Sequence, residues 1–239
     1  YGPRDFDRIR LPEDSPLRQA VVISNPLGED TSIMRTSPLP SMLGVLQKTY
    51  AARNLAARLY EIRNEYLYTG PDTLPDERMT LTIGLYGEKE DFYSLSGILT
   101  RMAQILHIPG LSLKASSDHP TFHPGRCADI LLDGRVIGMA GEVHPLTQAN
   151  YELKSRTYLA KVDFTALYDA HTDAHYTPLP RFPAVTRDLA LVCDDALPVG
   201  EIERTLREAM GDLLESVTPF DVYKGAQVAE GTKSVAYAH

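Results

Sequence analysis

The sequence predicts an α+β protein that contains an antiparallel sheet with helices on one side, followed by a smaller β-α-β-β unit. Strand-like stretches outnumber helical ones over residues 1–170. Asp133-Gly134 stands between two apolar runs, which is a strong signal for a β-hairpin and hence for antiparallel pairing. Beyond residue 180, one strand, one helix and two further strands follow one another. These three observations set the fold class.

Short apolar runs and alternating patterns predict the strands of the first part. The clearest runs from Met79 to Leu85, where apolar residues alternate with polar or small ones and give one buried face. A polar turn with two prolines, Pro71–Arg78, precedes it. The predicted strands are Ala20–Ile23, Ile33–Thr36, Leu59–Tyr66, Met79–Leu85, Leu111–Ala115, Ala128–Leu132, Arg135–Gly141 and Tyr158–Val162.

Apolar residues at helical spacing predict two long helices and a short one. Pro38 suits the first turn of the first helix. Asp91 is the expected N-cap of the second, and Pro109-Gly110 follows its end. The predicted helices are Pro38–Tyr50, Phe92–Leu106 and Phe164–Tyr168.

Residues 171–180 are the predicted linker between two domains, 1–170 and 181–239, because prolines, histidines and small polar residues are interleaved there without periodicity. The second domain reads as an incomplete ferredoxin-like β-α-β-β-α-β fold whose last helix and strand would follow His239. Its predicted elements are the strand Leu189–Cys193, a helix that begins near Pro198 and reaches Leu213, and the strands Val217–Tyr223 and Ser234–Tyr237.

Composition is that of an ordinary globular protein, with 239 residues of which 43% are hydrophobic. No apolar run is long enough for a membrane helix, and no secretory signal opens the chain. A start at Tyr1 rather than methionine indicates a piece of a longer protein. Cys127 and Cys193 fit no metal or redox spacing and lie in strand-like stretches, so we expect buried free thiols in a reducing cytoplasm.

Two histidine-containing segments are the candidate chemical sites. His119 and His123 have the spacing of a zinc pair on a helix, but Pro120, Pro124 and Gly125 make a helix implausible, so a structured turn is expected instead. Glu142 and His144 share one face of an extended chain and would suit an acid/base pair. No nucleophile motif or phosphate-binding loop accompanies them. The sequence therefore predicts no catalytic and no metal site.

Several segments, in a fixed order, resemble the beta subunit of bacterial phenylalanine–tRNA ligase. The family has an "MRTSLLPGLL"-like stretch after an Asn-Pro turn, whereas this chain has Pro38 in place of a leucine, Ser41-Met42 for Gly-Leu, and Arg63 for the glycine of an "LFEIG"-like strand. The matching segments are Asn25-Pro26-Leu27-Gly28, Met34-Arg35-Thr36-Ser37-Pro38-Leu39-Pro40, Leu59-Tyr60-Glu61-Ile62, His123-Pro124-Gly125-Arg126, Gly138-Met139-Ala140-Gly141-Glu142-Val143-His144-Pro145, Arg181-Phe182-Pro183, Arg187-Asp188-Leu189-Ala190, Phe220-Asp221-Val222-Tyr223 and Gly231-Thr232-Lys233-Ser234.

This resemblance implies that residues 1–170 form a catalytic-like module with the class II synthetase fold that lacks a working site. The module would support assembly with the catalytic alpha subunit, as part of a heterotetramer of two alpha and two beta subunits in the cytoplasm. The whole enzyme would use ATP and Mg²⁺ to esterify phenylalanine onto tRNA(Phe), while this segment would bind no cofactor itself. The editing domain of the family would lie upstream.

Residues 181–239 resemble the start of the family's ferredoxin-fold anticodon-binding domain. The resemblance places anticodon contacts on Asp221, Tyr223 and Ser234. A tyrosine ring can stack on a base, a carboxylate can accept from a guanine edge, and a hydroxyl suits either role. Arg187 and Lys224 would add phosphate contacts. The plainer interpretation is that Tyr223 packs in the sheet and Asp221 is solvated.

Two other functions stay open at this level: a freestanding, hydrolase-like enzyme that uses His123, Glu142 and His144, and a stand-alone RNA-binding adaptor. The formal net charge of −8 opposes general nucleic-acid affinity, because phosphate binding needs clustered Lys and Arg. We therefore expect this chain alone to bind tRNA weakly. Low-salt filter binding with a sub-micromolar dissociation constant would contradict that expectation.

Overall fold

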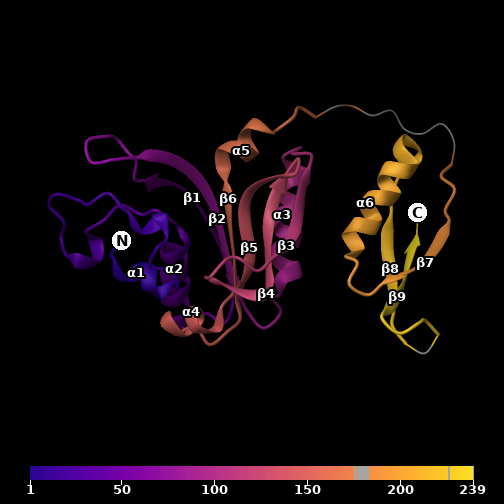
Figure 1. The fold of residues 1–239 in the computed structure, drawn as a ribbon, viewed down its shortest axis with the longest axis horizontal. Coiled ribbons are helices and arrows are strands. Elements are labelled where there is room, and N and C mark those ends of the chain that lie inside the picture. Colours follow the sequence, from indigo (N-terminus) through magenta and orange to yellow (C-terminus); the bar gives the residue numbers. More distant parts are fainter. Residues whose placement is uncertain (175, 177–182, 226, 239) are drawn as a thin grey trace. The chain divides into compact units, whose positions relative to one another are not determined.

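A computed structural model describes residues 1–174, 176, 183–225 and 227–238 (Figure 1). The chain forms two compact units, Tyr1–His175 and Tyr176–His239. Half of the predicted linker, residues 175 and 177–180, lies outside the described residues, as does the Arg181-Phe182 pair. Within the described part, no helix is long and apolar enough to cross a bilayer.

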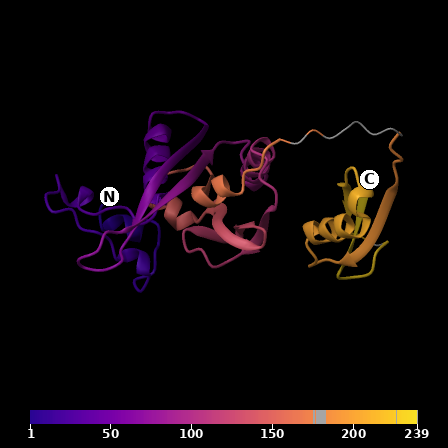
Figure 2. The same ribbon diagram turned by 90° about the horizontal axis from the view of Figure 1, so that it is seen from above.

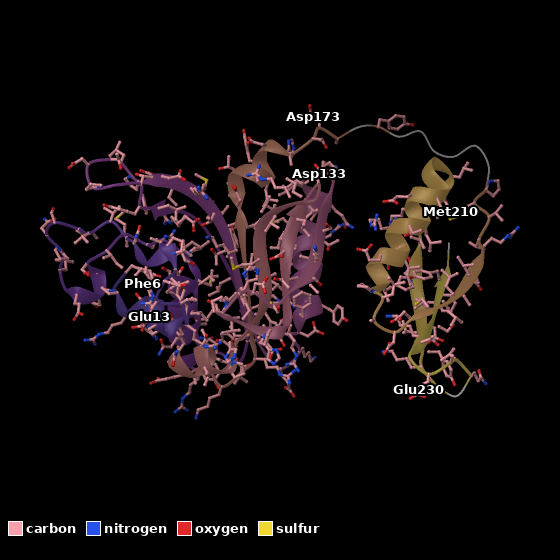
Figure 3. All side chains as sticks on the ribbon, viewed as in Figure 1. Phe6, Glu13, Asp133, Asp173, Met210 and Glu230 are labelled. Atoms are coloured by element: carbon pink, nitrogen blue, oxygen red, sulfur yellow. The ribbon has the colours of Figure 1, made fainter. Side chains whose placement is uncertain are left out.

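The first unit is built on a single antiparallel sheet of six strands, in the order β1-β2-β6-β5-β4-β3 (Figure 1). Asp133 lies at the tip of the predicted β4–β5 hairpin (Figure 3), where it and Gly134 have φ angles of 49° and 80°, as a tight hairpin loop requires. The α+β class is confirmed. The strands are β1 Ala57–Leu67, β2 Asp76–Tyr86, β3 Leu111–Ser116, β4 Phe122–Leu132, β5 Arg135–Val143 and β6 Thr157–Asp163.

Helices cover both faces of this sheet, so the prediction that they lie on one side is wrong. Successive side chains of a strand point to opposite faces. On β2, Leu81 and Ile83 pack in a core with α3 (Phe92–Ile105) and α5 (Phe164–Asp169). The other face carries a second core that includes Tyr86 and residues of α2 (Leu39–Ala51). Figure 2 gives the view from above.

Two threonines explain why the pattern of β2 suggested a solvated face. Thr80 and Thr82 are 2% and 1% exposed, although their alternation with apolar residues is typical of a strand with one wet side. Gly84 continues the same face, and a Cβ there would lie 2.7 Å from Met42 Cγ and 2.9 Å from Leu46 Cδ1. Helix α2 therefore packs directly on the strand backbone.

The N-terminal region differs from the prediction. Ala20–Ile23 and Ile33–Thr36 do not form strands; a single bridge joins Val22 to Ile33. The Arg35 carbonyl instead accepts from the Tyr66 N–H, so this segment follows the outer edge of β1. Hydrogen bonds of β1 with β2 also extend into the predicted turn, as far as Asp76. The unpredicted short helices are α1 Arg4–Arg8, η1 Pro16–Arg18, η2 Glu29–Thr31 and α4 Pro145–Asn150.

The second unit has the predicted β-α-β-β order. The described residues of this unit form an antiparallel sheet of three strands, in the order β7-β9-β8 (Figure 1). Glu230 lies in the loop between β8 and β9 (Figure 3). The elements are β7 Asp188–Asp194, α6 Val199–Met210, η3 Gly211–Leu213, β8 Thr218–Tyr223 and β9 Thr232–Ala238. Of the two free cysteines, Cys127 is buried in the first unit, and Cys193 on β7 is only partly buried.

Candidate functional site

The exposed face of the second sheet brings together the three residues predicted to contact the anticodon. Tyr223 on β8 and Ser234 on β9 are direct cross-strand partners, and Asp221 pairs with Ala236 one step along the same face. Paired residues of antiparallel strands point to the same side, and positions two apart share a face. Asp221, Tyr223 and Ser234 therefore form one surface, which we call the anticodon face.

The opposite face of this sheet carries the core of the unit. Val235 and Tyr237 are 0% exposed, and they pack with Ile202 of α6 and with Val217. Because a one-residue slip of β9 would exchange its two faces, burial of Val235 and Tyr237 fixes the outward position of Ser234. The register of the sheet is thus set by its core.

Tyr223 is accessible, with 40% of its surface exposed. Its ring lies close to Gly225, where an added Cβ would meet the tyrosine Oη at 2.6 Å. A glycine at this position therefore leaves room for the present orientation of the ring. The ring is therefore partly packed and partly accessible. Asp221 is exposed, as both a base contact and the plainer interpretation, a solvated carboxylate, require.

The two predicted phosphate contacts have different surroundings. Lys224 Nζ forms an ion pair with Asp195, which follows β7, and this hydrogen bond holds the pKa of the Asp195 carboxyl below its usual value. Lys233 is buried and donates to the carbonyls of Asp195 and Leu197, at 2.8 and 2.5 Å, so it fixes this loop from the core side. Arg187 is exposed and donates to the Thr186 carbonyl at 3.1 Å. Lys224 is thus already neutralised locally.

In the first unit, the three residues of the hydrolase-like alternative do not form a catalytic arrangement. The Nδ1 atoms of His123 and His144 accept backbone N–H groups, from Gly125 and Leu146, each at 3.1 Å. His144 thereby caps α4. Glu142 is hydrogen-bonded to neither histidine among the described contacts. This alternative therefore has no support in the geometry.

Glu142 instead belongs to an ion cluster that the sequence analysis missed. Arg126 Nη1 lies 3.0 and 2.9 Å from its two carboxylate oxygens, Arg156 Nε lies 3.8 Å away, and Tyr158 Oη donates at 3.4 Å. These residues come from β4, β5 and β6 or the turn before it. Glu142 and Tyr158 are cross-strand partners on β5 and β6, so they share one face of the sheet. The signal in the sequence was that Arg126 and Glu142 each stand in a segment that resembles the family.

His119 and His123, which have the spacing of a zinc pair, make separate contacts. His119 Nε2 lies 2.7 Å from Asp129 Oδ1, on the sheet face opposite to Glu142. His123 lies in β4, which begins at Phe122 rather than at Ala128 as expected. Within the described residues, no group of three or more His, Cys, Asp or Glu side chains is placed to hold a metal ion.

Comparisons with known protein families show to which family this chain belongs. Residues 1–164 match the phenylalanyl tRNA synthetase beta chain CLM domain, and residues 180–239 match the ferredoxin-fold anticodon binding domain. The chain belongs to the phenylalanine–tRNA ligase beta-subunit family. The second match covers all five predicted contact residues.

Individual relatives of this family agree. The chain is 45% identical over 239 residues to the phenylalanine–tRNA ligase beta subunit of Clostridium tetani and 43% identical over 239 residues to that of Clostridium acetobutylicum. Each alignment covers 99% of this chain and 30% of the relative, so the chain spans under a third of these beta subunits. Among solved structures, pyrrolysyl-tRNA synthetase from Desulfitobacterium hafniense aligns with a TM-score of 0.55 at 14% identity, over 69% of this chain and 57% of that one. This likeness concerns the fold alone.

Proposed function

We propose that this chain contributes to the binding of the tRNA(Phe) anticodon within a phenylalanine–tRNA ligase, as part of its beta subunit. One observation carries the proposal: Asp221, Tyr223 and Ser234 share an exposed sheet face inside the segment that matches an anticodon-binding family. The reaction of the whole assembly would be the ATP-dependent esterification of phenylalanine onto tRNA.

Each residue of the anticodon face has a role that fits its chemistry. The exposed ring of Tyr223 offers a stacking platform for a base, and base–aromatic stacking requires no particular sequence. The Asp221 carboxylate accepts hydrogen bonds from a guanine edge, and the Ser234 hydroxyl can donate or accept. An acidic residue on an RNA-binding face favours base readout over phosphate binding, because phosphates repel it. Arg187 is the better phosphate ligand, since Lys224 is paired with Asp195.

For the first unit we propose a supporting role. Residues 1–170 would form a catalytic-like module of the class II synthetase type, residues 171–180 a linker, and residues 181–239 the anticodon-binding domain. The antiparallel six-stranded sheet and its likeness in fold to a tRNA synthetase support this division. The module would pack on the catalytic alpha subunit in an assembly of two alpha and two beta subunits, in the cytoplasm where tRNA is charged.

ATP and Mg²⁺ are requirements of the whole enzyme in this proposal. Among the described residues, no three His, Cys, Asp or Glu side chains gather to hold a metal ion. We assign the chemistry of ATP and Mg²⁺ to the rest of the enzyme.

The test uses the full-length beta subunit, purified together with its alpha subunit. Phenylalanylation kinetics would be compared with those of an assembly whose beta subunit ends before Tyr176. We expect the shortened assembly to show a raised KM for tRNA and unchanged KM values for phenylalanine and ATP. Failure of the full-length chain to co-purify with an alpha subunit, or an unchanged KM for tRNA, would count against the proposal.

A further inference from the structure

A cavity of about 520 Å³ lies in the first unit, on the face of the sheet that carries α3. It is bounded by the start of α3, by β3 and β4, and by the Glu142 cluster. Its size falls within the range of small-molecule sites, which is about 300–1,000 Å³. The anticodon face belongs to the other unit, so the cavity lining includes none of the residues proposed above to contact tRNA.

The polar end of the cavity is unusual because it contains a buried carboxylate. Glu142 is only 6% exposed, and burial of an unpaired charge is costly. Arg126 and Tyr158 hydrogen-bond to its oxygens, and Arg156 lies close to Oε1. Burial, followed by the Glu142 charge, raises the pKa of the Tyr158 hydroxyl, so this group stays a donor. The acceptor capacity of Glu142 is therefore largely used.

Donor capacity, in contrast, remains. A guanidinium carries five N–H groups, and Arg126 uses only its Nη1 nitrogen toward Glu142. The side chain of Arg156 is 65% exposed. It lies 3.8 Å from Glu142 and interacts with the Tyr158 hydroxyl, which leaves others of its five N–H groups for a ligand. Asp91 also lines the cavity, and its Oδ1 caps α3 by accepting from the Ser94 N–H and Oγ–H at 2.7 and 3.0 Å. The N–H groups of Arg126 and Arg156 at this end favour a ligand that brings an acceptor.

The remaining walls are apolar. Leu113 and Ala115 of β3, Ala128 of β4, and Phe92 and Tyr93 of α3 line them. Tyr93 is 80% exposed, and its ring meets that of Phe92 edge to face at 6.5 Å between centroids. The exposed ring of Tyr93 lies in the same lining as two guanidinium groups that have N–H donors to spare. This combination suits a ligand with a flat, apolar body and an anionic head.

We propose that this cavity binds a small molecule that carries a single carboxylate or phosphate group on an aromatic body. The anionic head is held by Arg126 and Arg156, and the ring lies among Tyr93, Ala115 and Leu113. Glu142 positions Arg126 and does not touch the ligand.

The test uses the full-length beta subunit assembled with its alpha subunit, and fluorine NMR of four probes. These are 4-fluorobenzoate, 4-fluorophenyl phosphate, neutral 4-fluorobenzyl alcohol and cationic 4-fluorobenzylamine. We expect one or both anionic probes to bind in preference to the neutral and cationic ones, and the comparison of the two identifies the head group. Two variants locate the binding: Arg156→Gln removes an exposed donor, and Ala115→Leu fills the cavity from an exposed strand position.

Each of these variants should weaken the preferred anionic probe at least about tenfold, which corresponds to about 1.4 kcal/mol. Arg101→Gln is the matched control, since Arg101 lies on α3 outside the cavity lining and its loss should change nothing. Thermal unfolding of all variants checks that they fold. The proposal is overturned if anionic probes bind no better than neutral ones, if binding survives both variants because it occurs on the alpha subunit, or if a protein side chain already fills the cavity in the assembly.

Discussion

Replacement of Tyr223 by alanine tests the anticodon face most directly. The ring is 40% exposed on the outer side of β8, and it is absent from the buried core cluster of its unit, so its removal should leave the fold intact. Stacking of a base on an aromatic side chain is worth about 1–3 kcal/mol. Since each 1.4 kcal/mol is tenfold, kcat/KM for tRNA should fall by about fivefold to about 150-fold. Tyr223→Phe keeps the ring and should keep most of the activity.

The assay measures phenylalanylation by the complete enzyme, with tRNA varied at saturating phenylalanine and ATP. Tyr168→Ala is the matched control, because Tyr168 is 74% exposed on α5 of the other unit. A second tRNA with an altered anticodon should already be a poor substrate, and Tyr223→Ala should cost it little more. If Tyr223→Ala stays within twofold of the parent enzyme, or loses as much on both tRNAs, the ring does not read the anticodon.

Three further predictions follow from single contacts. Because Asp195 is the ion-pair partner of Lys224, Lys224→Ala should change tRNA affinity little. Asp195→Asn frees the lysine, and the slope of log K against log salt should steepen by about 0.7 for each additional phosphate that the lysine neutralises. Salt titrations of tRNA binding measure this slope. Lys161→Met leaves Glu65 buried without its partner at 2.5 Å and should cost about 3–5 kcal/mol in denaturant unfolding, much of which Glu65→Leu should restore in the double variant. Burial, with Arg10 and His123 nearby, lowers the pKa of His144 from 6.5, so the folded state resists protonation of this imidazole. The unfolded state then binds more protons, and stability should fall as the pH drops below about 6.5. Measurements of Tm across this range should show a smaller fall in His144→Asn.

The sequence predicted best those strands that are marked by a local pattern, either an alternation of apolar and polar residues or a short apolar run. Residues 79–85, 111–115 and 158–162 fall inside β2, β3 and β6, and the Asp133-Gly134 turn is where the hairpin was expected. The faces of the sheet were harder to predict, because Thr80 and Thr82 look solvated but are covered by other elements. Burial of such residues depends on tertiary packing, which a period-two pattern does not contain.

In the candidate sites too, contacts within one strand could be predicted from the sequence, whereas contacts between distant segments could not. Asp221 and Tyr223 are two positions apart on one strand, so their common face follows from the alternation of side chains. The partner of Lys224 could not be predicted, because Asp195 lies on a different strand connection and reaches Lys224 only across β9. Glu142 likewise meets Arg126 and Arg156 through strand pairing. Arg126 and Glu142 both stand in segments that resemble the family, but the sequence does not show that these two segments pair.

The charges of the second unit limit how it can bind RNA under the function proposed above. From residue 178 onward the chain has six Lys and Arg against ten Asp and Glu, a formal charge of −4. Of the basic residues that the structure describes there, Lys233 is buried against carbonyls, Lys224 is paired with Asp195, and Arg204 is paired with Glu201 and Glu208. Little positive charge is left for phosphates, so under the function proposed above we expect the electrostatic part of tRNA affinity to come from other parts of the assembly. We expect the domain to contribute discrimination between bases instead, through stacking and hydrogen bonds on its exposed face, and its effect should therefore appear as specificity for the anticodon more than as overall affinity.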